Sequence, residues 1–140
     1  MSQIGIWKVR QSDAPPIARI LRELGWFKHL CSETDHQSVA CIEQHIALCT
    51  ADECHSVYVA ATQEHKVVGY SAVHWLPYLF LSRPEGYLSE LFILADYRGL
   101  GIGEALLEVI AKEAHERGCS RLMLVNSRSR DSYQRSFIPS

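Results

Sequence analysis

Apolar residues are spaced along the 140-residue chain in patterns typical of short strands and amphipathic helices. Runs rich in β-branched and aromatic residues predict strands, and apolar residues three and four positions apart predict helices. Strands are expected at residues 6–10, 55–62, 67–75, 87–94 and 121–126, and helices at residues 15–24, 37–50 and 102–117. Gly25 and Gly118 follow two of the helical patterns, where glycine commonly ends a helix. The predicted order is therefore β-α-α-β-β-β-α-β.

The connections indicate how the strands pair. The polar tetrad of residues 63–66 predicts a hairpin turn, which makes the strands on either side of it antiparallel. A helix joins residues 87–94 to residues 121–126, and such a crossover makes the two strands it connects parallel. The sequence predicts an α/β (α+β) fold with a mixed, mostly antiparallel central sheet flanked by helices, in a single domain over residues 1–140.

Composition and charge argue against several classes of protein. Hydrophobic residues make up 47% and charged residues 21% of the sequence, which is usual for a globular domain. No run approaches the roughly 18 apolar residues of a membrane span, and a net charge of −2 gives no reason to expect nucleic acid or an anionic membrane as a partner. The five cysteines contain no C-x-x-C pair, and the N-terminus lacks the pattern of a secretory signal. We therefore expect a cytoplasmic protein.

Cys41, His45 and Cys49 recur every four residues along the second predicted helix. Side chains at this spacing share one helical face, and thiolate and imidazole groups are ligands that zinc prefers. The alternative is that the cysteines pack as small apolar side chains, since free cysteine is among the most buried residue types. The sequence favours this second interpretation, and no metal site is predicted.

Residues 97–103 read YRGLGIG and place three glycines at alternate positions directly before the last predicted helix. Glycines let a ligand approach the backbone, and the first N–H groups of a helix attract anions. A Walker A loop would need Lys followed by Ser or Thr, and a dinucleotide fingerprint would need a third glycine where this chain has Leu106. A tight turn without a ligand is the remaining alternative, but three glycines cost about 0.5–1 kcal/mol each relative to alanine.

The spacing that fits is R-x-x-G-x-G, formed by Arg98, Gly101 and Gly103 between a strand and an amphipathic helix. The surrounding segment, SELFILADYRGLGIGEALLEVIAKEAHERGCSRLMLVN, resembles the acyl-CoA-binding centre of the GCN5-related N-acetyltransferase (GNAT) superfamily. The order of the preceding elements matches as well, so the resemblance covers nearly the whole chain. It implies a GNAT-like sheet, acetyl-CoA as co-substrate, and transfer of the acetyl group to a primary amine of a small molecule or protein.

The resemblance also implies which residues bind acetyl-CoA. Backbone N–H groups of the glycine segment would hold the pyrophosphate, and this segment comprises Arg98, Gly99, Leu100, Gly101, Ile102, Gly103 and Glu104. The pantetheine arm would pair with Leu91, Phe92 and Ile93, beside a notch where their strand splays from the next one. Asn126, at the end of that next strand, matches a position that often bonds the pantetheine.

Acetyl transfer to an amine requires a base, because an alkylamine has a pKa near ~10.4 and must lose a proton before it attacks. Glu90 is the candidate base, since it lies in the strand beside the implied notch; a structural carboxylate is the alternative. The N–H group of Phe92 or Ile93 would stabilise the oxyanion. Tyr133 is the candidate acid for the departing thiolate, with packing as the alternative, because Ile138 stands where many relatives carry a tyrosine.

The sequence departs from the family pattern at its end, since relatives usually continue into two further strands beyond Ser140. We expect those strands to be absent and residues 121–126 to form an uncovered edge, which favours a homodimer. The short end also leaves a second function open, a non-catalytic acyl-CoA-binding sensor or partner module with the same fold. Candidates for an acceptor pocket, or alternatively for the core, are Trp26, Phe27, Trp75, Tyr78 and Phe80.

Overall fold

The computed structural model of the chain describes residues 4–25 and 35–124. The strands are β1 (Gly5–Lys8), β2 (His55–Ala61), β3 (Val67–Leu76), β4 (Glu85–Ile93) and β5 (Arg121–Leu124). The α-helices are α1 (Ala14–Leu24), α3 (Asp35–Thr50) and α4 (Ile102–Glu116), with short 3-10 turns η1 (Gln11–Asp13) and η2 (Ala95–Tyr97). The predicted order of elements is confirmed, and the bounds differ from the predicted ones by a few residues.

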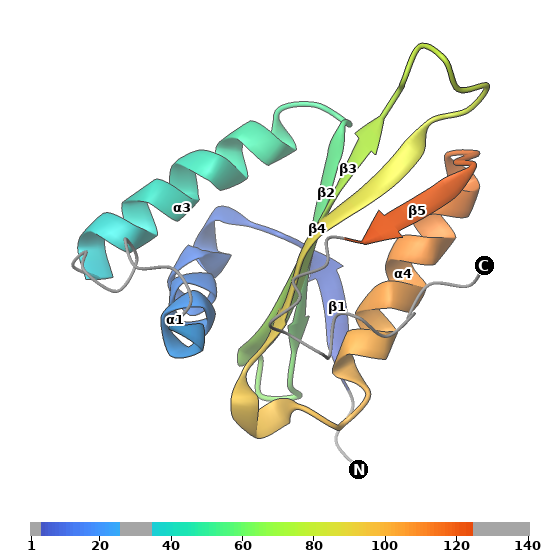
Figure 1. Cartoon of the computed structure of the whole chain (residues 1–140). Coiled ribbons are helices and arrows are strands. Elements are labelled where there is room, and N and C mark those ends of the chain that lie inside the picture. Colours follow the sequence, from blue (N-terminus) through green and yellow to red (C-terminus); the bar gives the residue numbers. More distant parts are fainter. Residues whose placement is uncertain (1–3, 26–34, 125–140) are drawn as a thin grey trace.

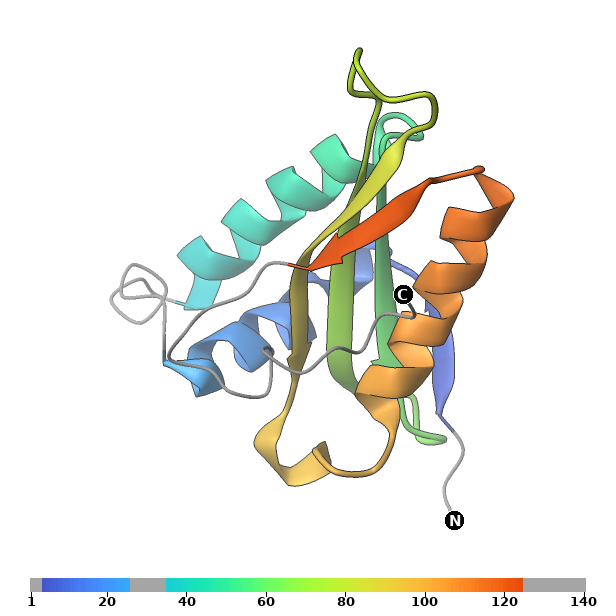
Figure 2. The same ribbon diagram turned by 45° about the vertical axis from the view of Figure 1, so that its right-hand side comes forward.

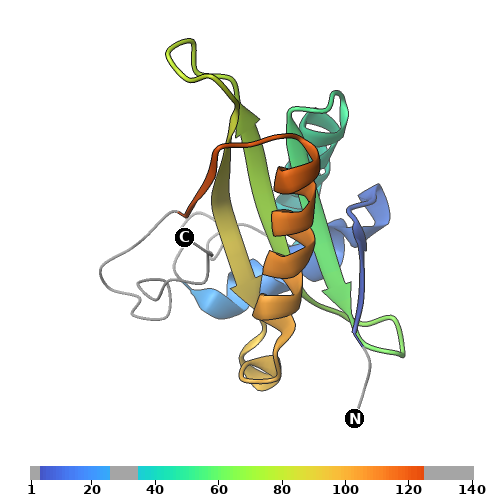
Figure 3. The ribbon, with the colours of Figure 1, turned by 90° about the vertical axis from the view of Figure 1, so that its right-hand side faces the viewer.

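The five strands form one sheet in the order β1-β2-β3-β4-β5 (Figure 1). The first four strands are antiparallel neighbours, and β5 runs parallel to β4, as the hairpin and the crossover helix predict. Helices α1 and α3 cover one face of this sheet, and α4 covers the other, which faces the viewer in Figure 3. The structure therefore confirms the mixed, mostly antiparallel sheet flanked by helices.

Apolar side chains are buried on both faces of the sheet. The predicted helical periodicity accounts for this, because the buried positions of α1 include Ile17, Ile20 and Leu21, and those of α4 include Ile102, Leu106 and Ile110. Gly25 ends α1 with a φ of 68°, a left-handed conformation that glycine adopts without strain.

A buried polar network fastens α4 to the sheet. Glu113 of α4 accepts hydrogen bonds from the Ser56 hydroxyl at 2.9 Å, the Tyr58 hydroxyl at 2.5 Å and Arg117 Nε at 2.8 Å. Burial raises the pKa of Glu113, but hydrogen bonds from Tyr58, Arg117 and Ser56 outweigh it, so the net pKa is lowered. The Trp75 indole joins the network by donating to Ser56 Oγ at 3.0 Å. The network joins the C-terminal half of α4 to β2 and β3.

The two ends of β4 lead into different features (Figure 2). At its start, the β3–β4 loop projects beyond the sheet and exposes Leu79 and Phe80. At its end, β4 passes through η2 into the glycine segment. Within the described part of the chain, no helix is long and apolar enough to cross a membrane. The predicted absence of two further strands stays a prediction, because the described residues end with β5 at Leu124.

Candidate active site

A β-bulge interrupts β4 at Ser89. Ala72 of β3 pairs with Glu90 and Val73 pairs with Leu88, so Ser89 is an extra residue without a counterpart on β3. Ser89 Oγ lies 2.7 Å from His74 Nε2, and Glu90 Oε1 lies 2.5 Å from the Tyr70 hydroxyl. His74 and Tyr70 are four residues apart on β3 and therefore share one face. The bulge thus places two successive polar side chains on the same face of the sheet.

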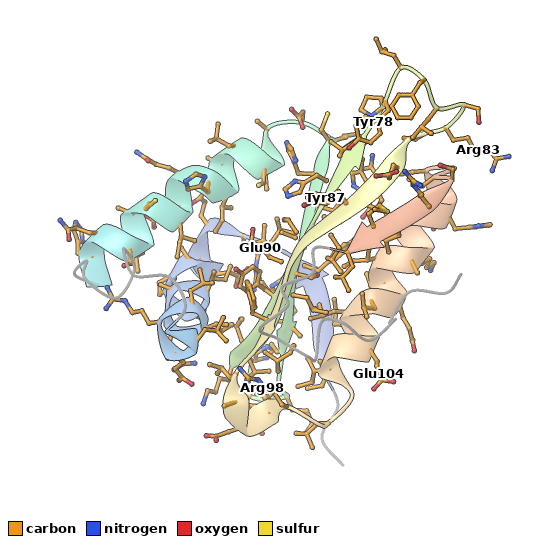
Figure 4. The ribbon with its side chains drawn as sticks, viewed as in Figure 1. Tyr78, Arg83, Tyr87, Glu90, Arg98 and Glu104 are labelled. Carbon is orange, nitrogen blue, oxygen red and sulfur yellow. The ribbon has the colours of Figure 1, made fainter. Side chains whose placement is uncertain are left out.

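Glu90 lies on the face that α1 and α3 cover, near the middle of β4 (Figure 4). It is half-buried, and the Tyr70 hydroxyl donates the 2.5 Å hydrogen bond to its carboxylate. The aromatic ring of Phe92, two residues further along β4, packs edge-on against the Tyr70 ring at 5.8 Å. This packing and the hydrogen bond orient the carboxylate that the sequence predicts as the base.

Two histidines that the sequence did not indicate lie on the same face of the sheet as Glu90, and the charge of Glu90 acts on one of them, His74. His55 of β2 and His74 of β3 are directly paired across the sheet, and their Nδ1 atoms are 2.8 Å apart. Burial and the neighbouring His55 lower the pKa of His74, and the negative charge of Glu90 opposes part of that effect. On α3, burial followed by the charge of Glu90 raises the pKa of Cys49. Glu90, His74 and Cys49 therefore belong to one electrostatic neighbourhood on the α1/α3 face.

The glycine segment forms an open turn at the start of α4. Gly99 and Gly101 have φ values of 78° and 84°, and a Cβ atom placed with ideal geometry at either position would meet no atom within 4 Å. Gly101 is the N-cap residue, and no side chain caps the helix. The first N–H groups of α4 therefore lie at an open surface with the positive end of the helix dipole, which suits an anion.

The other predicted cofactor-binding residues surround this turn and the end of β4. Arg98 is exposed and its Nε donates to the Ile93 carbonyl oxygen at 3.0 Å, while Ile102 is buried under the turn. Arg98 and Glu104 mark the two sides of the glycine segment in Figure 4. Leu100 and Glu104 are exposed, Ile93 is half-buried, and Leu91 and Phe92 are buried. The predicted residues thus form one continuous strand–turn–helix surface.

Some predicted features lie elsewhere. The described β4–β5 ladder joins residues 85–88 to residues 121–124, and the implied notch further along β4 would be bordered by residues outside the described part of the chain. Asn126, Tyr133, Trp26 and Phe27 also lie outside it, so their roles stay predictions. Trp75 belongs to the core on the α4 face, opposite Glu90, and does not face the candidate site.

Among the described residues, no group of metal-ligating side chains forms around Cys41, His45 and Cys49 of α3. Cys41 and Cys49 are half-buried, and His45 is exposed. Among residues 4–25 and 35–124, no group of three or more His, Cys, Asp or Glu side chains is arranged to hold a metal ion.

Gly103 provides a test that separates ligand binding from folding. It lies in the first turn of α4 without a positive φ, and a Cβ at this position would meet no atom within 4 Å. Alanine should therefore stabilise the free protein by about 0.5 kcal/mol through its helix propensity. If the glycine is there to let a ligand approach, Gly103→Ala should also weaken acetyl-CoA binding roughly tenfold, or about 1.4 kcal/mol. Thermal unfolding measures the stability and calorimetric titration measures the affinity. An unchanged affinity for acetyl-CoA would contradict binding of the cofactor by the glycine segment.

Comparison with known proteins agrees with this fold. The chain matches the acetyltransferase (GNAT) family over residues 19–137. It is 27% identical over 128 residues to mouse thialysine N-epsilon-acetyltransferase, covering 89% of this chain and 75% of the relative. A ribosomal-protein-alanine N-acetyltransferase from Brucella melitensis biovar Abortus 2308 superposes with a TM-score of 0.73 at 22% identity, covering 94% of this chain and 87% of that structure.

A second similar structure contains CoA. The aminoglycoside N-acetyltransferase AAC(6')-Iy in complex with CoA superposes with a TM-score of 0.74 at 15% identity, covering 96% of this chain and 84% of that structure. The fold is the one that these acetyltransferase structures share. The chain belongs to the acetyltransferase (GNAT) family, and we class it as an acetyltransferase.

Proposed function

We propose that this protein transfers the acetyl group of acetyl-CoA to a primary amine by direct attack in a ternary complex. The observation that carries the proposal is the path of β4, which presents Glu90 on the α1/α3 face and then leads into the open turn before α4. One strand thus connects a surface suited to a diphosphate with a carboxylate suited to an ammonium group.

The residues have distinct roles in this proposal. The backbone of residues 98–104 holds the pyrophosphate, residues 91–93 lie along the pantetheine arm, and Asn126 bonds to that arm. Glu90 holds the ammonium group of the acceptor by charge, and the proton leaves through neighbouring groups. The N–H group of Phe92 or Ile93 stabilises the oxyanion, and Tyr133 protonates the departing thiolate.

The acceptor in this proposal is a small molecule with a primary alkylamine. The curated relatives support this choice, since mouse, cattle and pig proteins that match the chain are thialysine N-epsilon-acetyltransferases. We also propose a cytoplasmic location. We further propose a homodimer that pairs through the β5 edge. Light scattering at high protein concentration tests the homodimer, and the mass of a monomer would contradict it.

The function is tested by turnover with a panel of amines. Purified protein is mixed with acetyl-CoA and either thialysine, lysine, a polyamine or an aminoglycoside, and the release of free CoA thiol is followed. Acetylated amine formed in step with the thiol would support the transferase. Binding of acetyl-CoA without transfer to any acceptor would instead favour the alternative, a non-catalytic acyl-CoA-binding module.

A further inference from the structure

Three polar side chains from three adjacent strands form a hydrogen-bonded chain that ends at the bulge in β4. His55 Nδ1 of β2 lies 2.8 Å from His74 Nδ1 of β3, and His74 Nε2 lies 2.7 Å from Ser89 Oγ of β4. The two imidazole rings meet edge-on, with centroids 5.0 Å apart and an angle of 77° between the planes. The bulge is what brings Ser89 into this chain, next to Glu90.

The chain can pass a proton between Ser89 and His55. A short contact between two Nδ1 atoms requires that one of them bears a proton and the other accepts it. In one arrangement Ser89 donates to His74 Nε2 and His74 Nδ1–H donates to His55 Nδ1. In the other arrangement His55 Nδ1–H donates to His74 Nδ1, and His74 Nε2–H donates to Ser89 Oγ. Ser89 then donates to the Ala72 carbonyl oxygen, 3.4 Å away. The two arrangements differ only by proton positions, which is the property of a relay.

The surroundings keep the central imidazole ready to accept a proton. Burial and His55 lower the pKa of His74 from its ordinary value, so its neutral form predominates at neutral pH. The groups that face the pair are Glu90 and the Tyr87 ring from β4 and Asp52 from the loop after α3, while Cys49 of α3 interacts electrostatically with both of these carboxylates. The carboxylates of Glu90 and Asp52 favour a transient positive charge on the imidazoles, and no cation from the described residues contacts the pair.

We propose that Ser89, His74 and His55 form a relay that carries the proton of the acceptor amine from the site to solvent, an inference that rests on the proposed acetyl transfer. An N–H bond of the ammonium group breaks, and its proton goes to Ser89 Oγ as the Ser89 hydroxyl proton moves to His74 Nε2. The His74 Nδ1 proton moves to His55 Nδ1, and the resulting imidazolium loses its Nε2 proton to water. The amine keeps the electron pair with which it attacks the thioester.

The relay and Glu90 have different tasks, which kinetics can separate. Glu90 holds the ammonium group, so its loss should affect both KM for the amine and kcat. The relay only removes the proton, so His74→Gln should lower kcat on the order of 10²-fold with KM for both substrates changed by less than about twofold. Ser89→Ala should have a similar effect, and Ser89→Thr should retain most of kcat because it keeps the hydroxyl.

The pH profile gives a readout that a structural role would not move. The wild-type rate should fall as pH drops through the pKa of His74, because a protonated His74 cannot accept a proton. His55→Gln removes one of the two causes that lower the pKa of His74, so this acidic limb should shift to higher pH while kcat falls. In His74→Gln the limb should disappear.

Matched controls and outcomes decide the proposal. His115→Gln replaces an exposed histidine on α4 and should leave kcat and the pH profile unchanged. Calorimetric titration with acetyl-CoA checks that each variant is folded. If His74→Gln is not folded, the comparison of Ser89→Ala with Ser89→Thr tests the relay. If the wild type turns over and the Ser89, His74 and His55 variants keep its kcat and pH profile, the relay is overturned and the proposed function is not. Absence of wild-type turnover with every amine of the panel would overturn the proposed function, and the relay with it.

Discussion

Glu90→Gln should lower kcat/KM for the acceptor amine on the order of 10²-fold while the affinity for acetyl-CoA stays the same. Glutamine keeps the shape of the side chain and an oxygen that can accept the hydrogen bond from the Tyr70 hydroxyl, so the local packing is retained. The negative charge is lost, and with it the attraction for an ammonium group, which is worth about 4 kcal/mol at 4 Å when the effective dielectric constant is about 20. Initial rates at saturating acetyl-CoA measure the effect.

A matched control for this substitution is Glu108→Gln, which removes the same charge from an exposed position on α4. Its kcat/KM should equal that of the wild type, because a solvent-exposed charge remote from the site is screened. If Glu90→Gln kept its activity within about threefold of the wild type, the carboxylate would be structural and Glu90 would have no part in holding the acceptor.

Gly101→Glu should abolish measurable acetyl-CoA binding, with a loss of at least about 10²-fold in affinity. Gly101 has a φ of 84°, and a Cβ there would point into open space at the uncapped start of α4. A glutamate at this position would bring bulk and a negative charge to the surface where the pyrophosphate is proposed to bind, and at 4 Å the repulsion is of the order of 4 kcal/mol. Isothermal titration calorimetry measures the affinity directly.

The backbone strain of this substitution must be separated from its charge. Any non-glycine residue at a positive φ costs roughly 1–2 kcal/mol, so Gly101→Glu should also lower the thermal midpoint by several degrees. Gly101→Asn is the matched control, since asparagine tolerates the left-handed conformation and carries no charge. It should lose much less affinity than the glutamate variant. Equal affinity of Gly101→Glu and the wild type would show that the open turn does not bind the cofactor.

The sequence by itself predicts the order of elements, the β2–β3 hairpin and the parallel pairing of β4 with β5. These features follow from local signals, because helical periodicity, turn residues and the length of a connection act within a few positions of each other. The glycine segment is of this kind as well. Arg98, Gly101 and Gly103 are close in sequence, and their position before an amphipathic helix is enough to indicate an anion-binding turn.

Glu90 shows where local reasoning reaches its limit. Its place in the strand was predictable, but the neighbours that surround it were not. His55 and His74 are nineteen residues apart, and they meet only because β2 and β3 pair in that register. Ser89 joins them because the bulge turns it to the same face as Glu90. Nothing in the residues around position 89 signals a bulge.

The sequence alone therefore determined which elements form and which turn is open to an anion. Only the tertiary structure decided which side chains share a face. A shift of one residue in register moves every side chain of a strand to the opposite face, and the energy that selects the register comes from packing across the whole sheet. For the same reason Trp75 became part of the core on the α4 face, together with Glu113, and the histidine chain formed beside Glu90 on the other.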